Sequence, residues 1–213
     1  MNYISNLIGL MFKGVITTLE VFILTLVFSV ALGLIVALGR LSKIKLISTI
    51  TQVYILIMRG TPLLLQLIFV FFGLPIIGVT LDRFPAAILT FVLNYSAYFG
   101  EIFRGGIESI DKGQHEAAEV LGLTQRRTFL RIILPQVIKR TLPPISNEVI
   151  TLVKDTSLVY VVGIGELLRA GKAAANRDAS LVPLVIVAIF YLIFTGILAK
   201  GFKYLEKRYS YYQ

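Results

Sequence analysis

The feature that most constrains this chain is a long, largely apolar run at residues 15–38, in which Glu20 is the one charged residue. About 20 consecutive apolar residues are enough for a helix to cross the hydrocarbon core of a bilayer. The rest of the chain agrees, because 56% of its 213 residues are hydrophobic and the mean hydropathy is +0.83. Such values are typical of integral membrane proteins and exceed those of soluble domains. The sequence therefore predicts an all-α integral membrane protein.

Four more apolar segments follow the first, which gives about five transmembrane helices in a single domain over residues 1–213. The first helix carries small residues at every fourth position, namely Ser29, Gly33 and Ala37, which would let another helix pack closely against it. The second is interrupted at Arg59-Gly60-Thr61-Pro62, and such a break is tolerated only if it packs in protein or lines a cavity. The predicted spans are residues 15–38, 47–72, 84–103, 145–164 and 181–199.

The distribution of basic residues predicts the orientation. Five spans put the two ends of the chain on opposite sides, and most of the 21 Lys and Arg residues then fall on one side. Basic loops remain in the cytoplasm, so we expect the N-terminus outside, and the C-terminus and the loop at about 105–142 inside. This arrangement accounts for the net charge of +9 without nucleic acid. The first apolar run is too long for a cleavable signal peptide, so we expect it to be retained.

Polar side chains share one face of the third span. Asn94, Tyr98 and Glu101 are spaced at i, i+4 and i+7. A carboxylate within a membrane is costly unless it faces the interior of the bundle or water. Arg104, three residues after Glu101, offers a local ion pair near the membrane edge, which does not exclude a place in a cavity wall.

The fourth span carries a similar stripe of Glu148, Thr151 and Asp155, and a polar break follows at Lys154-Asp155-Thr156-Ser157. The break predicts a partly unwound helix whose freed backbone groups face a site. Alternatively, Lys154 and Asp155 neutralise partners on adjacent helices. Gln66 shares a face with Arg59. The candidate substrate-binding residues are Gln66, Asn94, Tyr98, Glu101, Asp155, Thr156 and Ser157.

The long polar insertion at residues 106–135 reads as a short helix, a stop and a second helix. Asp111 caps a helix over 112–121, with Gln114 placed for a capping box. Gly122 supplies a left-handed stop, and Thr124 caps a second helix that runs towards Pro135. The first helix would insert small, apolar side chains into a groove on another protein: Ala117, Ala118 and Leu121.

The same insertion carries a family resemblance. Glu116-Ala117-Ala118, Gly122, Ile132 and Leu134-Pro135 stand at the spacing of the EAA loop of permease subunits of ATP-binding-cassette importers, which they resemble. Three flanking stretches resemble the polar amino-acid branch of that family: Arg59-Gly60-Thr61-Pro62, residues 106–113 and Lys154-Asp155-Thr156-Ser157-Leu158. The resemblance covers the chain from about residue 17 to its C-terminal end.

The resemblance implies that the insertion is the coupling helix that docks on an ATPase subunit, through Glu116, Ala117, Ala118, Leu121 and Gly122. It implies a multi-pass protein of the bacterial cytoplasmic membrane, surrounded by lipid. The implied partners are a pair of ATP-binding subunits, a second permease subunit that is either identical or homologous, and an extracytoplasmic amino-acid-binding protein. ATP and Mg would be bound by the ATPase, and no cofactor by this chain.

Several other chemistries lack their motifs. A phosphate-binding Gly-x-x-x-x-Gly-Lys-[Ser/Thr] loop is absent from the sequence, so nucleotide must bind to another chain. One histidine and no cysteine argue against a structural zinc site, and the Gly-x-Ser-x-Gly elbow is also absent. We therefore expect neither catalytic nor metal-binding residues. The sequence also lacks a convincing internal repeat, which a secondary transporter usually has.

These observations predict an ATP-driven importer of polar amino acids. Three carboxylates in the stripes against one arginine favour a cationic substrate, whereas Gln66 and Asn94 keep glutamine as an alternative. One rival is an ion-coupled secondary transporter or channel that uses Glu101 and Asp155. A second rival is a membrane-embedded hydrolase that uses Glu116 or His115.

Overall fold

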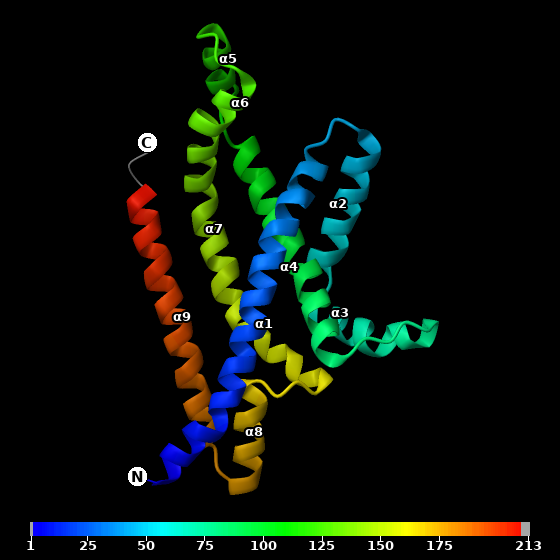
Figure 1. The fold of residues 1–213 in the computed structure, drawn as a ribbon, viewed down its shortest axis with the longest axis vertical. Helices are drawn as coiled ribbons and strands as arrows, with labels where there is room; N and C mark the ends of the chain where they lie inside the picture. Colours follow the sequence, from blue (N-terminus) through cyan, green and yellow to red (C-terminus); the bar gives the residue numbers. More distant parts are fainter. Residues whose placement is uncertain (1, 210–213) are drawn as a thin grey trace.

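The chain forms an elongated bundle of helices, and a computed structural model describes it. The backbone of residues 2–209 is described, with the side chains of residues 7–9 and 11–209, and this part contains no β-strand. Five long helices run roughly along the longest axis (Figure 1): α1 (Asn2–Arg40), α2 (Lys45–Gly60), α4 (Arg83–Glu108), α7 (Leu134–Asp155) and α9 (Val182–Tyr209).

Shorter helical pieces connect the long ones. A bend after α2 leads into α3 (Leu63–Ile68), the π-helical η1 (Phe69–Gly73) and the 3-10 turn η2 (Leu74–Ile77). At one end of the bundle lie α5 (Lys112–Val120), α6 (Gln125–Thr128) and the π-helical η3 (Phe129–Ile133). The 3-10 helix η4 (Thr156–Val162) and α8 (Leu167–Asp178) lie at the other end, near the start of α1 (Figure 1).

Three helical stretches within the described residues are long and apolar enough to cross a membrane. They are Leu7–Arg40, Arg83–Glu108 and Val182–Tyr209. The pair Lys45–Gly60 and Leu63–Ile77 would be a fourth span, but it bends by 103° at its break. The all-helical membrane fold is therefore confirmed. The span expected at residues 145–164, and with it the count of five, stays a prediction.

The most extensive contact between two helices of the described bundle joins α1 to α4. A Cβ on Gly33 would lie 2.8 Å from Cβ of Phe99 and 3.2 Å from the backbone nitrogen of Gly100, so only glycine permits this approach. Ser29 and Ala37 are buried on the same face of α1. The small-residue stripe predicted from the sequence therefore packs against another helix, as expected.

Helix α4 lies at the centre of the core. Its buried aromatic residues Phe91, Tyr95 and Phe99 pack in one cluster with Leu152 and Val153 of α7. These contacts fix the rotation of α4 relative to α7. The polar residues that alternate with them therefore face a defined direction.

Helix α7 differs from its predicted course at both ends. It starts at Leu134 and continues through Pro143 and Pro144, so the last part of the loop expected over about 105–142 is already helix. Membrane helices tolerate prolines because neighbouring groups satisfy the freed carbonyls. At its other end α7 tightens into η4 and stops at Gly163, whose φ of +85° is left-handed. The predicted unwinding at residues 154–157 is therefore wrong.

The last two helices follow η4. Helix α8 lies between the fourth and the fifth predicted spans. Helix α9 continues through the basic segment to Tyr209, beyond the predicted end at 199. Residues 210–213 of the basic, aromatic tail lie outside the described residues. The start of α1 lies at one end of the bundle, and α9 runs back towards the end that carries α5 (Figure 1).

Candidate functional site

Two polar side chains, Gln66 and Asn94, form hydrogen bonds with the backbone at the break between α2 and α3. The Gln66 amide nitrogen donates to the Thr61 hydroxyl (2.7 Å), the Thr61 carbonyl (3.2 Å) and the Met58 carbonyl (3.0 Å). Asn94 of α4 donates to the same Met58 carbonyl (2.8 Å) and to Oε1 of Gln66 (3.0 Å). Gln66 and Asn94 therefore hold the bent backbone in place, and their amide donors are largely committed to it.

The bend, α4 and α7 together line a half-open cavity, which we call the substrate cavity after the predicted substrate residues in its wall. Its volume is about 490 Å³. One cation and two carboxylates are among the described residues that line it. The lining residues are Arg59, Gly60, Thr61, Pro62, Leu63, Asn94, Tyr95, Tyr98, Glu148, Thr151 and Asp155.

Asp155 is held in the wall of this cavity by a tyrosine from the facing helix. The hydroxyl of Tyr95, whose side chain is only 2% exposed, donates to Oδ2 of Asp155 over 2.7 Å. A carboxylate has several acceptor positions, so this bond leaves Asp155 able to accept from a ligand as well. The alternative that Asp155 meets a partner on an adjacent helix is correct in part, since the partner is a neutral hydroxyl.

The stripe on α7 was correctly grouped from its spacing. Glu148, Thr151 and Asp155 all line the substrate cavity. Glu148 and Arg59 were nevertheless not among the candidate substrate-binding residues. The signal that would have identified them was available, because Glu148 shares a helical face with Asp155 and Arg59 adjoins the break.

A second cavity of about 460 Å³, the inner cavity, adjoins the substrate cavity on the side towards α5. Three residues line both cavities, namely Arg59, Gly60 and Tyr98. The guanidinium carbon of Arg59 lies 5.1 Å from the centroid of the Tyr98 ring. The remaining lining residues of the inner cavity are Arg40, Gln52, Ile55, Leu56 and Glu101.

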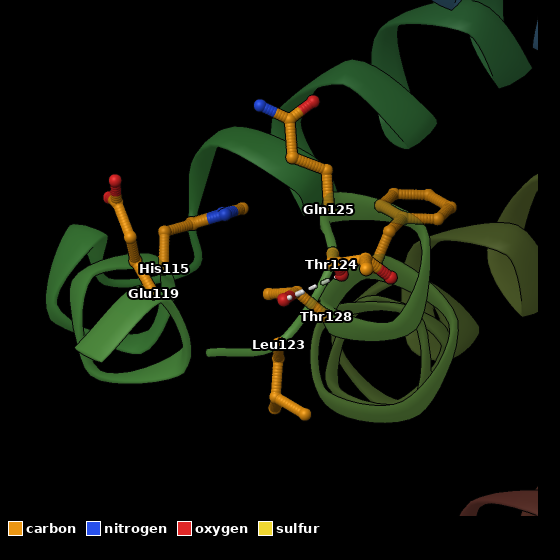
Figure 2. A pocket seen from close by; sticks show the side chains of 7 residues that line it. His115, Glu119, Leu123, Thr124, Gln125 and Thr128 are labelled. Carbon is orange, nitrogen blue, oxygen red and sulfur yellow. Dashed lines mark hydrogen bonds between the residues drawn. The ribbon is translucent and has the colours of Figure 1, made fainter. Parts of the chain in front are cut away.

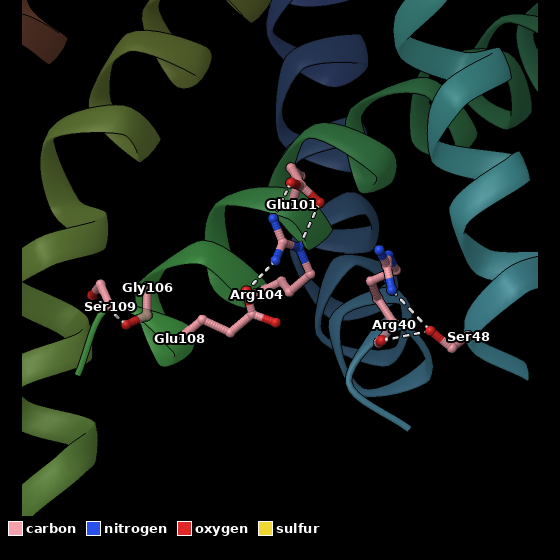
Figure 3. Close-up of polar contacts among 7 residues, drawn as sticks. All are labelled: Arg40, Ser48, Glu101, Arg104, Gly106, Glu108 and Ser109. Atoms are coloured by element: carbon pink, nitrogen blue, oxygen red, sulfur yellow. Dashed lines mark hydrogen bonds and ion pairs between the residues drawn. The ribbon is translucent and has the colours of Figure 1, made fainter. Parts of the chain in front are cut away.

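Glu101 faces the inner cavity and is paired with a cation. Arg104 Nε donates to Glu101 Oε2 over 2.9 Å, and a second guanidinium nitrogen contacts the other carboxylate oxygen. Arg104 also pairs with Glu108 (Figure 3). The predicted local ion pair is therefore confirmed, and the charge of Glu101 is neutralised within α4. Near it, Arg40 donates to the Ser48 hydroxyl over 2.8 Å (Figure 3).

Three of the candidate substrate residues line neither cavity, namely Gln66, which bonds to the bend, and Thr156 and Ser157. Thr156 is fully buried, its hydroxyl donates to the Val153 carbonyl (2.6 Å), and its amide donates to carbonyls of Leu152 and Lys154. The Ser157 hydroxyl donates to the Lys154 carbonyl (2.7 Å). The expectation that free backbone donors at Thr156 face a site is wrong, because η4 continues the helix.

At the α5 end, the chain folds as its capping residues predict. The amide of Gly113 donates to the Asp111 carboxylate (2.6 Å), and the amide of Arg127 donates to the Thr124 hydroxyl (3.4 Å). Gly122 has a left-handed φ of +70°. Its amide donates to the Glu119 carbonyl, and the Leu123 amide donates to the Ala118 carbonyl. This pair of bonds is a Schellman stop. Gln114 departs from the predicted capping box, since its Oε1 accepts from Gln136 at 3.5 Å.

The exposed face of α5 differs partly from the predicted one. Ala118 is buried, so it packs within the loop and does not belong to the face offered to another protein. Val120 and Leu121 are 88% and 75% exposed, and Glu116 and Ala117 are exposed as well. Val120 was missed by the sequence reasoning, although it adjoins Leu121.

A hollow of about 600 Å³ lies between α5 and α6. Figure 2 shows His115 and Glu119 on one side of it and Thr124 and Gln125 on the other. Leu123, Thr128 and Phe129 complete its lining. An exposed apolar tip therefore lies beside a hollow in the same loop.

At the opposite end, Glu166 is completely buried. It caps α8, with one carboxylate oxygen accepting from the Leu168 amide and the other from the Arg169 amide, both at 2.6 Å. Tyr191 of α9 donates to it (3.2 Å), and the adjacent Leu167 amide donates to Thr18 of α1. Burial raises the pKa of Glu166 above its ordinary value, and the hydrogen bonds it accepts partly oppose that change.

Comparison with protein families gives one match over most of the chain. The family described as "Binding-protein-dependent transport system inner membrane component" matches residues 29–211. The L-cystine transport system permease protein TcyB of Bacillus subtilis (strain 168) is 40% identical, with 93% of this chain and 86% of the relative covered. The arginine transport system permease protein ArtQ of the same organism is 38% identical over 92% of this chain and 90% of the relative.

The glutamine transport system permease protein GlnP of Escherichia coli (strain K12) is 37% identical, with 94% and 93% of the two chains covered. Among solved structures, an amino acid ABC transporter crystallised with histidines superimposes with a TM-score of 0.89 at 35% identity, covering 96% of each chain. The MetNI methionine transporter in an inward-facing form gives a TM-score of 0.72 at 18% identity, a likeness of fold alone.

Proposed function

Because the chain belongs to the family of binding-protein-dependent transport system inner membrane components, and is a membrane subunit of an amino-acid ATP-binding-cassette importer, we propose that it carries cationic amino acids through the substrate cavity. The observation that supports this most directly is the charge of the cavity wall. Glu148 and Asp155 face it together with a single cation, Arg59. The wall therefore carries an excess of negative charge when both carboxylates are ionised.

An amino acid with a basic side chain presents two positive groups and one negative group. The two carboxylates would bind the two positive groups, and Arg59 would balance the negative one. Glu101 does not contribute to this balance, because Arg104 neutralises it and because it faces the inner cavity. Of the three carboxylates in the predicted stripes, Glu148 and Asp155 are therefore assigned to the substrate and Glu101 is not.

Glutamine remains the second candidate substrate, because the cavity wall contains the amide of Asn94. The amide nitrogen of Asn94 already donates to Met58 and Gln66, so the structure favours glutamine less than a cationic substrate. The names of two relatives mention arginine and glutamine, one for each possibility, and a third mentions L-cystine, which is neither.

ATP hydrolysis is assigned to a partner chain that docks on α5. The exposed Val120 and Leu121, the adjacent hollow and the rigid stop at Gly122 form the surface we assign to that contact. ATP and Mg would bind between two copies of the partner. The permease would then pair with a second subunit, identical by default because closed two-fold symmetry is the commonest arrangement. An extracytoplasmic protein would deliver the substrate.

The substrate proposal is tested with the permease and its ATPase subunits purified together in lipid nanodiscs. Binding of arginine, lysine, histidine, glutamine and glutamate is compared in the wild type, Asp155→Asn and Glu148→Gln. We expect the wild type to prefer cationic amino acids and each variant to lose most of that preference. Asp82→Asn, which removes an acid at the start of α4 outside the cavity, is the matched control and should keep it.

A preference for glutamate, or an unchanged cationic preference in both variants, would contradict the proposal. Transport by this chain alone in liposomes, without ATPase or nucleotide, would support a secondary transporter instead. Crosslinking of the singly expressed permease tests the pairing. A chain that remains monomeric and works only with a second, different permease would exclude the homodimer.

A further inference from the structure

Arg59 lies where the substrate cavity and the inner cavity adjoin, and it lines both of them. A cation inside a membrane helix is costly unless it faces water, a cavity or a counter-charge. Arg59 lies at the end of α2, one residue before the break, and faces both cavities. Its side chain is exposed and does not belong to the packed core, so it is accessible from both cavities.

The α-carboxylate of an amino acid needs a donor in the substrate cavity. The backbone donor first expected at Thr156 is engaged within the helix. Among the described residues that line the substrate cavity, Arg59 is the one with a cationic side chain. A guanidinium offers a planar fork of N–H donors that matches a carboxylate with two parallel hydrogen bonds.

The contact with Tyr98 prepares Arg59 for that role. With the guanidinium carbon 5.1 Å from the ring centroid, the cation interacts with the electron-rich face of the ring. Such a contact restrains the side chain and leaves the N–H groups at the edge of the guanidinium available for a carboxylate. Tyr98 lines both cavities as well, so the two side chains lie together where the cavities adjoin.

We propose that Arg59 binds the α-carboxylate of the transported amino acid, and that Arg59 and Tyr98 together form the partition between the substrate cavity and the inner cavity; this rests on the proposed transport of amino acids. The carboxylate then binds to Arg59, the same side chain that separates the two cavities. Every amino acid shares this group, so Arg59 selects for amino acids as a class, whereas Glu148 and Asp155 select among them.

The charges on the two sides of the partition differ. The substrate cavity has two carboxylates and Arg59. The inner cavity has Arg40 and Arg59, and its carboxylate, Glu101, is already paired with Arg104. A cationic amino acid is therefore attracted by the substrate cavity and repelled by the inner cavity, which lies on the side towards α5. This difference favours release once the partition opens.

Pairs of ligands that differ only in the carboxylate test the role of Arg59. The first pair is arginine and its decarboxylated amine, agmatine, and the second is glutamine and its decarboxylated form, 4-aminobutanamide. Binding is measured on the permease–ATPase complex in nanodiscs, without a binding protein. We expect the wild type to bind the amino acid about 10- to 100-fold more tightly than the amine, as for a lost hydrogen bond to a charged group.

In Arg59→Met, arginine should bind no more tightly than agmatine, and retained agmatine binding shows that the cavity is folded. Arg59→Lys should restore part of the discrimination. Arg83→Met removes a cation that lines neither cavity and should discriminate like the wild type. Undiminished discrimination in Arg59→Met would overturn the assignment. If glutamine binds and arginine does not, the cationic preference fails while the second pair still tests Arg59.

A leakage measurement tests the partition separately. Complexes in liposomes are tested for entry of labelled arginine in the absence of ATP. Tyr98→Leu, which removes the ring, should leak, whereas Tyr98→Phe, which keeps the ring under Arg59, should remain tight. A tight Tyr98→Leu variant, or equal leakage of the two, would refute the partition and leave the carboxylate role of Arg59 to the binding test.

Discussion

The hydroxyl of Tyr95 on α4 donates a 2.7 Å hydrogen bond to Oδ2 of Asp155 at the end of α7. The two residues are 60 positions apart in the chain, and their contact joins two of the helices that line the substrate cavity. A buried phenol with one acceptor partner fixes the position of that carboxylate. The orientation of Asp155 is therefore decided by the packing of α4 against α7.

Removal of this bond is expected to weaken substrate binding. In Tyr95→Phe, Asp155 loses its donor while the ring still fills the core. Hydrogen bonds to charged groups contribute about 1.5–3 kcal/mol, so we expect at least about tenfold weaker binding of the cationic amino acid. Tyr54→Phe is the matched control, because the Tyr54 hydroxyl bonds to α4 outside both cavities. Equal effects of the two variants on affinity would argue against a role for the Tyr95–Asp155 bond.

Gly122→Val is expected to disconnect the permease from its ATPase. Valine is strained at the φ of +70° that the Schellman stop requires, by about 1–3 kcal/mol, so α5 should be misplaced. We expect normal membrane insertion with lost co-purification of the ATPase, or lost stimulation of its activity. Gly122→Asn is the control, since asparagine tolerates the left-handed region. Wild-type transport by Gly122→Val would disprove the coupling role.

Leu121→Asp is expected to weaken the same contact without disturbing the fold. Leu121 is 75% exposed at the tip of α5, so a charge there costs little in the isolated subunit and much in an apolar interface. We expect ATPase affinity to fall at least about tenfold. Leu181→Asp places the same change on a residue that is 74% exposed at the other end of the bundle. If only the Leu181 variant loses the ATPase, the docking surface has been assigned to the wrong end.

Glu166 is expected to make stability depend on pH. Its pKa is raised in the folded protein above the ordinary value of 4.5, chiefly by burial. The folded state therefore holds the proton more tightly than the unfolded chain. The stability due to the protonated carboxyl is complete below pH 4.5 and is lost as pH rises through the folded pKa.

Thermal unfolding in detergent, measured from pH 4 to 8, tests this expectation. The wild type should lose stability over that window relative to Glu166→Gln, whose neutral amide does not titrate. Glu20→Gln, a change at an exposed carboxylate on α1, is the control and should follow the wild type. Parallel profiles for the wild type and Glu166→Gln would show that Glu166 does not titrate there.

Much of the structure was predictable because it depends on residues close in sequence. The caps at Asp111 and Thr124, the stop at Gly122 and the Glu101–Arg104 pair all form within five residues. Helical periodicity likewise placed Glu148, Thr151 and Asp155 on one face. Backbone geometry alone dictates such relationships, so they hold whatever the helices pack against.

Tertiary structure decided which of these faces meet and what each polar group is free to do. Gln66 and Asn94 bond to each other and to the bend, Thr156 is buried, and Arg59 joins Asp155 in the cavity wall. None of this follows from spacing, because it depends on the 103° bend after α2 and on the rotation of α4 against α7. Periodicity defines a face only relative to its own helix axis, and the close packing of neighbouring helices sets where that face points.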